Sequence, residues 1–422
     1  MSPLPDAPLA SPAPAWFDER RRAVAARIGE PVVPSTDEEV WRYSRVADID
    51  LASWTLPEEP EPAVPAAVVE LLDSLPTSSA TVVVRNGYVV FAEVAPAWSA
   101  KGVFAGRLVE GPDGEAALGV VAGDGPDVFA ALNDATAPDP VLVSVPAGVV
   151  LDAPVVVVDW VDADGAAVQP RLVVRLGENA EATVLDWHGS TDVAALVTPV
   201  IELDVARAAR LGYTNVQVRG PRVWQIASQL SRVDADATLT SAQACLGGDY
   251  ARARTDCHLV GRGATGNLEA AYFGEGNQTL DFRTFQQHAA PDTTSNLLFK
   301  GAVGEHSRSV YTGLIKVEKQ ARGTNAFQTN RNLKLSEHAW AESVPNLEIE
   351  TNDVRCSHAS TVGPIDEDQR FYLESRGVPT AIAERLVVAG FFAEVLEDLP
   401  VAGVAPLVEL AIEERLARSF AR

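Results

Sequence analysis

The feature that most constrains the fold is a repeat of short strand-like runs between about residues 141 and 349, separated by small residues in similar settings. The repeat is marked by alanines at steps of 28, 29 and 27 residues, namely Ala180, Ala208, Ala237 and Ala264. A regular period of short strands with small residues at the corners is typical of a β-solenoid, in which each coil buries a face on the next. A large antiparallel sandwich or barrel would also give short strands between turns, and the pattern alone leaves that alternative open. We expect the parallel β-helix.

The residues before this repeat, 1–140, are rich in proline and helical only in patches. A helix is predicted over Trp16–Glu30, where apolar residues recur at helical spacing. Leu56–Ala66 contains four prolines and is expected to be an extended linker. Thr81–Val94 is strand-like, and its central Asn86-Gly87 predicts a hairpin turn. The N-terminal region should therefore contain helices and one small strand element.

The residues after the repeat, 363–422, have helical periodicity. Asp366 is expected to be the N-cap of a first helix that stops at Gly377, and Thr380 the N-cap of a second. The second helix should place Leu386 and Phe391 on one apolar face. A third helix has apolar residues four apart, namely Val408, Ile412, Leu416 and Phe420. These faces exceed what a lone terminal hairpin needs, so part of this surface is predicted to bind a partner.

Composition narrows the classes of partner and compartment. The chain has 58 acidic and 34 basic residues, and its net charge of −24 argues against nucleic acid or an anionic membrane surface as a partner. No apolar run approaches the roughly 20 residues that span a bilayer. The segment MSPLPDAPLASPAPAW lacks the regions of a signal peptide, and three dispersed cysteines do not suggest a disulfide framework. A cytoplasmic protein is expected.

Common catalytic and nucleotide-binding motifs are missing or misleading. Gly261–Gly266 reads GRGATG, which matches the dinucleotide-binding pattern, but a strand-like NLEAAYF follows it where a helix is required. We interpret it as a glycine-rich corner of the solenoid. The sequence has no Walker A loop, no nucleophile elbow and no HExxH motif. Neither catalytic nor cofactor-binding residues are therefore predicted for the chain alone.

One short motif carries chemistry: Cys356-Ser357-His358. Residues i and i+2 of a strand share a face, so the thiol and the imidazole could meet one metal ion or each other. A complete metal site would need further ligands, and no second Cys/His cluster lies nearby in the sequence. The alternative is a buried thiol beside a surface histidine, and the residues alone do not decide between the two.

The region from about His288 to Phe392 resembles the SufB/SufD family of iron–sulfur cluster assembly scaffolds. The resemblance rests on an ordered series of pieces: Lys300-Gly301, Gly313-x-Ile315-x-Val317, Ala321 with Gln328, Pro345-x-Leu347-Glu348-Ile349, Asp353-Val354-x-Cys356-Ser357-His358, Gly363-x-Ile365-Asp366, Gln369-x-Phe371-Tyr372 and Ser375-Arg376-Gly377. It continues weakly upstream to Trp41-Arg42-Tyr43. Such a series in order is highly specific.

The resemblance implies a mainly β fold, a right-handed parallel β-helix over residues 141–362, with a helical N-terminal region (1–140) and a C-terminal helical domain (363–422). It further implies a SufB–SufD heterodimer in which the C-terminal helices of each scaffold bind the ATPase SufC. Leu386 and Phe391 are then the predicted contacts with SufC. A sulfur donor would act on the complex only indirectly.

Two departures from the SufB pattern favour the SufD branch of the family. In SufB-like chains a sulfur-accepting cysteine follows the glutamine that matches Gln328, whereas Thr329 stands here. A threonine hydroxyl has no thiolate-like state and cannot take up persulfide sulfur. The glutamates that flank the SufB histidine are also missing, with Ser357 and Ala359 in their place.

The resemblance assigns a cluster-building role at the SufB interface to His358, with Cys356 secondary to it. The iron–sulfur cluster would be transient there, and none is expected on the isolated chain. The chain is thus expected to be a non-enzymatic scaffold subunit that builds and transfers clusters with SufB and SufC. Two alternatives are a stand-alone β-helix enzyme acting on polysaccharide and a homodimeric scaffold that works without SufB.

Overall fold

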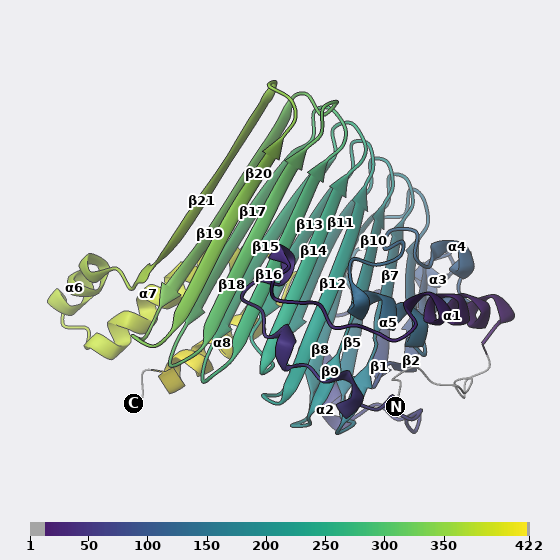
Figure 1. The fold of residues 1–422 in the computed structure, drawn as a ribbon, viewed down its shortest axis with the longest axis horizontal. Helices are drawn as coiled ribbons and strands as arrows, with labels where there is room; N and C mark the ends of the chain where they lie inside the picture. The colour runs from purple at the N-terminus through teal and green to yellow at the C-terminus, as the bar shows by residue number, and fades with distance from the viewer. Residues whose placement is uncertain (1–12, 420–422) are drawn as a thin grey trace.

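A computed structural model describes residues 13–419 of the chain, and its main body is a parallel β-solenoid (Figure 1). Apart from the outermost strand of each sheet at the N-terminal end, neighbouring strands pair in parallel and in register, and the two sheets face each other across a common interior. This confirms the β-solenoid and rules out the antiparallel sandwich. Helices lie at both ends of the chain.

The strands form two sheets. In spatial order, the ten-stranded sheet contains β2 (Tyr88–Val94), β1 (Ala80–Arg85), β5 (Val155–Val161), β8 (Glu181–Ser190), β11 (Arg210–Gln217), β13 (Thr238–Cys245), β15 (Thr265–Gly274), β17 (Thr294–Val303), β19 (Thr324–Lys334) and β21 (Val354–Pro364). The eleven-stranded sheet contains β20 (Trp340–Ile349), β18 (Arg308–Val317), β16 (Thr279–His288), β14 (Tyr250–Leu259), β12 (Val223–Val233), β10 (Val200–Val205), β7 (Arg171–Leu176), β4 (Val141–Val145) and β3 (Phe104–Arg107). Its two short strands lie off this path: β9 (Ala195–Val197) pairs with β12, and β6 (Ala166–Val168) pairs with β9.

The alanine repeat marks one corner of the solenoid. At this corner each coil turns through a residue with positive φ, in the column Gly148, Asn179, Ala208, Asp236, Gly263, Asp292 and Gly323. Their N–H groups donate to carbonyls of the next coil at 2.7 to 3.1 Å. The small residue that follows is fully buried, as at Ala180, Ala237 and Ala264. In this register the equivalent of Ala180 is Ala209 rather than Ala208, so that marker was misplaced by one residue.

The same column explains the GRGATG segment at Gly261–Gly266, which matches the dinucleotide-binding pattern. Gly263 occupies the left-handed corner position with φ +73°, and β15 begins two residues later at Thr265. Glycine adopts this conformation at no steric cost. The GRGATG segment is therefore a solenoid corner, as interpreted from the sequence.

The N-terminal elements close the first end of the solenoid. Asn86 and Gly87 both have positive φ and join β1 to β2, which confirms the hairpin. β1 pairs in parallel with β5, whereas β2 and β3 add as antiparallel outer strands. The helices of this region are α1 (Ala15–Ile28), α2 (Ala66–Ser74), α3 (Pro96–Ser99), α4 (Gly114–Ala117) and α5 (Val128–Thr136), with 3-10 turns at Glu39–Trp41, Val46–Asp48, Leu51–Ser53 and Leu108–Glu110. The small strand element is thus continuous with the solenoid.

Residues 29–55 form an arm that crosses the outer face of the eleven-stranded sheet (Figure 1). The arm is anchored on two buried arginines that share the carboxylate of Asp281: Arg252 at 2.6 Å and Arg283 at 2.7 Å. Arg252 also donates to the carbonyl of Val40 and lies 3.8 Å from the ring centre of Trp41. Each buried charge is therefore paired and hydrogen-bonded, as burial requires.

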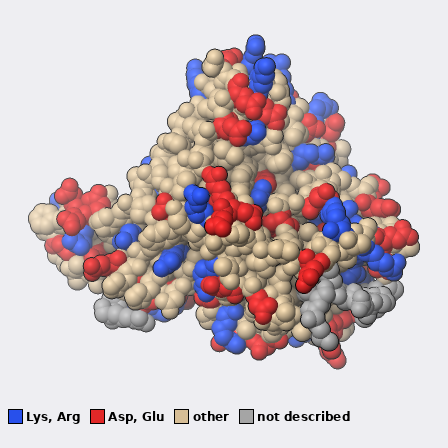
Figure 2. Space-filling model, in the orientation of Figure 1, with Lys and Arg blue, Asp and Glu red and all other residues tan. Residues whose placement is uncertain are grey.

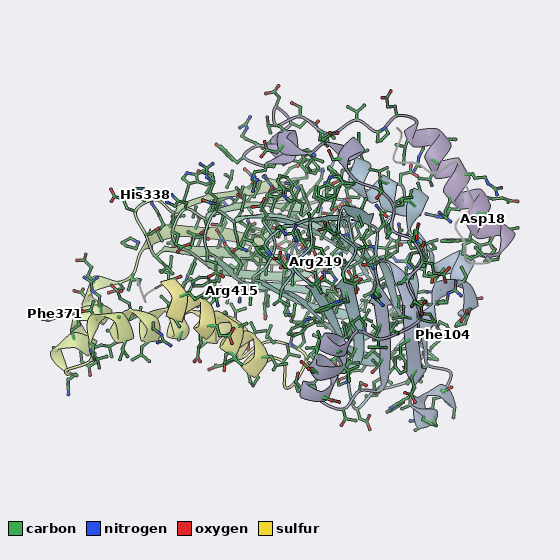
Figure 3. The ribbon with its side chains drawn as sticks, turned by 90° about the horizontal axis from the view of Figure 1, so that it is seen from below. Asp18, Phe104, Arg219, His338, Phe371 and Arg415 are labelled. Atoms are coloured by element: carbon green, nitrogen blue, oxygen red, sulfur yellow. The ribbon has the colours of Figure 1, made fainter. Side chains whose placement is uncertain are left out.

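The C-terminal helices are α6 (Glu367–Ser375), α7 (Thr380–Leu396) and α8 (Ala405–Ser419). α7 and α8 pack on the outer face of the ten-stranded sheet, where Arg415 of α8 donates to the carbonyl of Leu246 at 3.0 Å (Figure 3). Of the apolar residues spaced four apart in α8, Val408, Ile412 and Leu416 are buried, while Phe420 lies outside the described residues. No helix within residues 13–419 is long and apolar enough to cross a bilayer.

Candidate functional site

The two ends of the solenoid differ. At the first end, the outermost strands β2 and β3 run antiparallel to their neighbours, and α1 packs on the outer face of β4 and β7 through Phe17, Leu142 and Val173. At the second end, β20 and β21 are the last strands of their sheets, and each pairs with one neighbour only. In the described chain nothing pairs with their outer edges, and nearly all their side chains are partly or fully exposed. This open end, formed by β20 and β21, presents two unpaired strand edges to solvent (Figure 1).

The open end carries the Cys-x-His motif. β21 is a regular strand in unbroken register with β19, which places Cys356 opposite Ala326 and His358 opposite Gln328. Ala326 and Gln328 are both buried in the interior of the solenoid. Side chains opposite each other in a sheet share a face, so Cys356 and His358 both belong to the interior face of the last coil. The shared face predicted from their spacing is thus present.

The two residues nevertheless differ in environment. Cys356 packs against the small apolar cluster that includes Leu347 and Val354, and it is only partly accessible. Burial raises the pKa of its thiol, a shift that a backbone hydrogen bond from Ala326 partly opposes. A thiol with a raised pKa provides less thiolate for metal binding or nucleophilic attack. His358 is exposed, because no further coil covers the interior face.

This pair is an incomplete metal site. Over residues 13–419, no three or more His, Cys, Asp or Glu side chains are grouped so as to hold a metal ion. An exposed imidazole and a half-buried thiol at the rim of the last coil can supply at most two ligands. Any cluster built there would need its remaining ligands from outside this chain.

A second hollow lies where the C-terminal helices meet the ends of the strands. It is a groove of about 870 Å³ whose lining combines apolar and charged side chains: Lys300, Arg331, Leu333, Pro364, Asp366, Asp368, Gln369, Tyr372, Leu373, Leu386, Val387, Gly390 and Phe391. Both residues predicted as partner contacts are in it. Leu386 is 51% exposed, whereas Phe391 is half-buried against the core beneath α7.

Lys300 fixes α7 against β17 at the floor of this groove. Its ammonium donates to the carbonyl of Phe391 at 2.8 Å, forms an ion pair with Glu394, and lies 4.9 Å from the ring centre of Phe391. The hydrogen bond from Lys300 is the main reason that the pKa of Glu394 lies below its ordinary value. Since Phe391 is held in place by these contacts, its ring is part of a fixed wall of the groove.

Other exposed residues near the open end were missed by sequence reasoning as sites. Phe371 and Tyr372 on α6 are 69% and 58% exposed, and Phe371 lies on the projecting tip of the molecule (Figure 3). Tyr43 of the arm, at φ +66°, contacts Trp340 of β20 with a ring separation of 5.8 Å. The aromatic residues of Phe371-Tyr372 and Trp41-Arg42-Tyr43 were the available signal in the sequence. Their exposure could not be predicted, because it depends on the assembled fold.

The solenoid interior also holds a charged network that the sequence did not reveal. Asp186 accepts hydrogen bonds from the Tyr213 hydroxyl at 2.6 Å and faces His188 Nε2 at 3.0 Å. Burial alone would raise the pKa of Asp186, but His188 and Tyr213 together hold it below its ordinary value. Arg219 is paired with Asp159 nearby, in the middle of the molecule (Figure 3). These groups are enclosed and lie on earlier coils than the open end.

The surface charge is mixed on the face that carries the arm. Figure 2 shows acidic and basic side chains scattered over it, with no large basic patch. A surface of this kind gives no long-range attraction for a polyanion. On this face the charge distribution agrees with the composition.

Comparison with known proteins places the chain in a family. Residues 160–391 match the family model described as "SUF system FeS cluster assembly, SufBD core domain". The chain is 37% identical to an iron–sulfur cluster assembly SufBD family protein of Mycobacterium tuberculosis, over 68% of this chain and 72% of that one. It is 34% identical to the iron–sulfur cluster assembly protein SufD of Escherichia coli over 57% of each chain, and 37% identical to SufD of Bacillus subtilis over 38% of this chain and 36% of that one. The chain therefore belongs to the SufB/SufD family of the SUF iron–sulfur cluster assembly system, and within it the chain is SufD-like.

Proposed function

We propose that this protein is a non-enzymatic scaffold subunit that pairs with a SufB-like scaffold through its open end. The observation that carries the proposal is the pair of unpaired edges at β20 and β21 with His358 on the interior face between them. A partner strand added to an exposed edge gains main-chain hydrogen bonds, and this would seal the last coil. Pairing there brings His358 against the partner, where the missing cluster ligands would lie.

His358 is the residue on which cluster assembly should depend. Neutral imidazole can bind iron, and its donation is weaker than that of thiolate, which suits a cluster that must later be transferred. The cluster is cargo, held between the two scaffolds and absent from either alone. Cys356 is secondary because its thiol is half-buried and its pKa is raised. The chain itself is proposed to catalyse no turnover.

We further propose that the groove lined by α6, α7 and the ends of β17 and β19 receives a SufC-like ABC ATPase. The lining combines apolar and charged side chains, which is the usual character of a protein-binding surface. Leu386 is exposed and would contribute contact area, whereas Phe391 and Lys300 hold the wall in shape. Movement of the ATPase would then reach the open end through α6, which follows β21 directly.

The test of the first proposal is anaerobic reconstitution of the three-protein complex with His358→Ala, Cys356→Ser or Ser360→Ala. Ser360 has the same strand and face as His358, so its variant controls for damage to the edge. Bound iron and sulfide should fall at least about tenfold with His358→Ala, because losing a side chain that binds iron costs more than losing one that only orients such a ligand. The effect of Cys356→Ser should be smaller, and that of Ser360→Ala negligible. All complexes must first co-elute intact on size exclusion.

Normal cluster content in His358→Ala would show that the histidine is a bystander. A chain that forms stable dimers alone and assembles clusters without the SufB-like partner would instead replace the heterodimer with a homodimer. For the groove, Leu386→Asp should abolish ATPase binding, whereas Ile382→Asp should not. Ile382 is 48% exposed on the same helix but lies outside the groove, so it is a matched control. Equal binding by both variants would place the ATPase elsewhere.

A further inference from the structure

A pair of histidines lies outside both sites described above. His306 precedes β18 and His338 precedes β20, and the register of these strands places the two residues at the same position of successive coils. Their rings are stacked, with centres 5.0 Å apart and planes inclined by only 6°. That separation is close to the spacing of adjacent strands, which explains the parallel rings. The pair thus follows from the solenoid repeat.

The imidazoles face an open hollow. Both residues are exposed, and they line a cavity of about 380 Å³ together with Asn277 and Glu305. Asn277 holds the same register position one coil earlier, so the column continues as a polar ladder. Glu337 is exposed beside His338 in the chain. Two imidazoles and nearby carboxylates favour a cation over an anion at this corner.

We propose that His306 and His338 bind one divalent first-row transition-metal ion, with water filling the other coordination positions. Imidazole is a good ligand for zinc, nickel, copper and iron. Metal–nitrogen bonds of about 2.0–2.1 Å hold two ligand nitrogens within about 4 Å of each other. The nitrogen lone pairs lie in the ring planes, which are nearly parallel, so both rings must rotate about their side-chain torsions before the lone pairs can converge on one ion. Exposed side chains change rotamer at little energetic cost.

The two-histidine site is compatible with the ligand content of the chain. A site with two protein ligands is smaller than the three-residue clusters that are missing from residues 13–419. It is separate from His358, which lies on β21 and on the interior face. An ion at this corner would join the coil of β18 to the coil of β20 and so would stabilise the last coil. The inference does not depend on the proposed function.

The experiment is a calorimetric titration of the untagged full-length chain with Ni²⁺, in wild type and in His306→Asn, His338→Asn and His258→Asn. Asparagine already occupies this column at Asn277, so these variants should keep the fold. His258 is also an exposed histidine, but its register neighbours are Arg232 and Gln287, so it is the matched control. The wild type should bind one Ni²⁺ per chain. The affinity for this ion should fall at least about tenfold in His306→Asn and in His338→Asn, and it should stay unchanged in His258→Asn.

A second measurement does not rely on calorimetry. Saturating Ni²⁺ should raise the Tm of wild type and of His258→Asn, and this increase should disappear in His306→Asn and His338→Asn. Three results would overturn the proposal. They are no Ni²⁺ binding by the wild type, an unchanged Ni²⁺ affinity in either His306→Asn or His338→Asn, and a loss of Ni²⁺ affinity in His258→Asn as large as in those two variants.

Discussion

Replacing His288 should remove a specific part of the pH dependence of stability. His288 is fully buried at the end of β16, with Nδ1 2.8 Å from the Thr293 hydroxyl and Nε2 3.0 Å from the Ser295 hydroxyl. Burial lowers the pKa of His288 from 6.5 to about 4. In the unfolded chain the same imidazole takes up a proton near pH 6.5, so acid favours unfolding.

The size of the effect follows from the two pKa values. Each pKa unit of difference corresponds to about 1.4 kcal/mol. Above pH 7 the histidine is neutral in both states, and the stability it confers is fully present. As the pH falls through 6.5 towards 4, that stability is lost progressively. At pH 5 the loss is about 2 kcal/mol, and below pH 4 it approaches about 3 kcal/mol.

The assay compares wild type with His288→Gln, in which the amide can still bond to both hydroxyls. The free energy of unfolding is measured by urea denaturation at pH 8, 7, 6 and 5. The difference between wild type and variant should shift by about 2 kcal/mol from pH 8 to pH 5, in favour of the variant at acid pH. The carboxylates shared by both chains cancel in this difference. A flat difference for His288→Gln would refute the reasoning.

Two further predictions concern the solenoid backbone. Gly301→Ala should destabilise the fold by about 1–3 kcal/mol, because the added Cβ would lie 1.8 Å from the buried ring of Tyr272. Gly363→Ala is the control: its Cβ would have no neighbouring atom within 4 Å, so the free energy of unfolding measured by urea denaturation should not change. Ala208→Asn should raise the free energy of unfolding by about 0.5–1 kcal/mol, because Ala208 has φ +57° and Asn179 already occupies that corner. A loss of stability in the latter would mean that the left-handed corner is not strained.

The fold was predictable because its signals are local and repeated. The corner column needs a residue that tolerates positive φ and then a small buried one, and this gives the sequence its period. Asp366 accepts from the N–H groups of Asp368 and Gln369, as expected of an N-cap. Thr380 was wrong as an N-cap: it is the first helical residue, and Pro379 precedes it with no side-chain cap. Proline before the helix fixes the entry without a capping hydroxyl.

The sites were less predictable because they depend on non-local geometry. α7 contains the doublets Val387-Val388 and Phe391-Phe392, so periodicity could not orient the helix. In the structure Val388 and Phe392 are fully buried, while Val387 and Phe391 line the groove. The open end is equally hidden, since the last strands of a solenoid are composed like the strands before them. The motif around His358 indicated a candidate metal-binding residue. Its exposure follows only from the position of β21 in the last coil, which the motif does not reveal.

The difference between the two ends of the solenoid bears on how many scaffold chains could stack end to end through their strand edges. In a solenoid whose two ends both continue the parallel stack, the last coil of one molecule could pair with the first coil of the next. Such head-to-tail contacts would extend the assembly into a filament. Here β2 and β3 are also the outermost strands of their sheets, but they run antiparallel to their neighbours, whereas β20 and β21 continue the parallel stack to its last coil. Under the pairing proposed above, the open end is the junction between two scaffolds. Further stacking from the first end would need an antiparallel strand pairing instead of another parallel coil, so the same kind of junction cannot be repeated there.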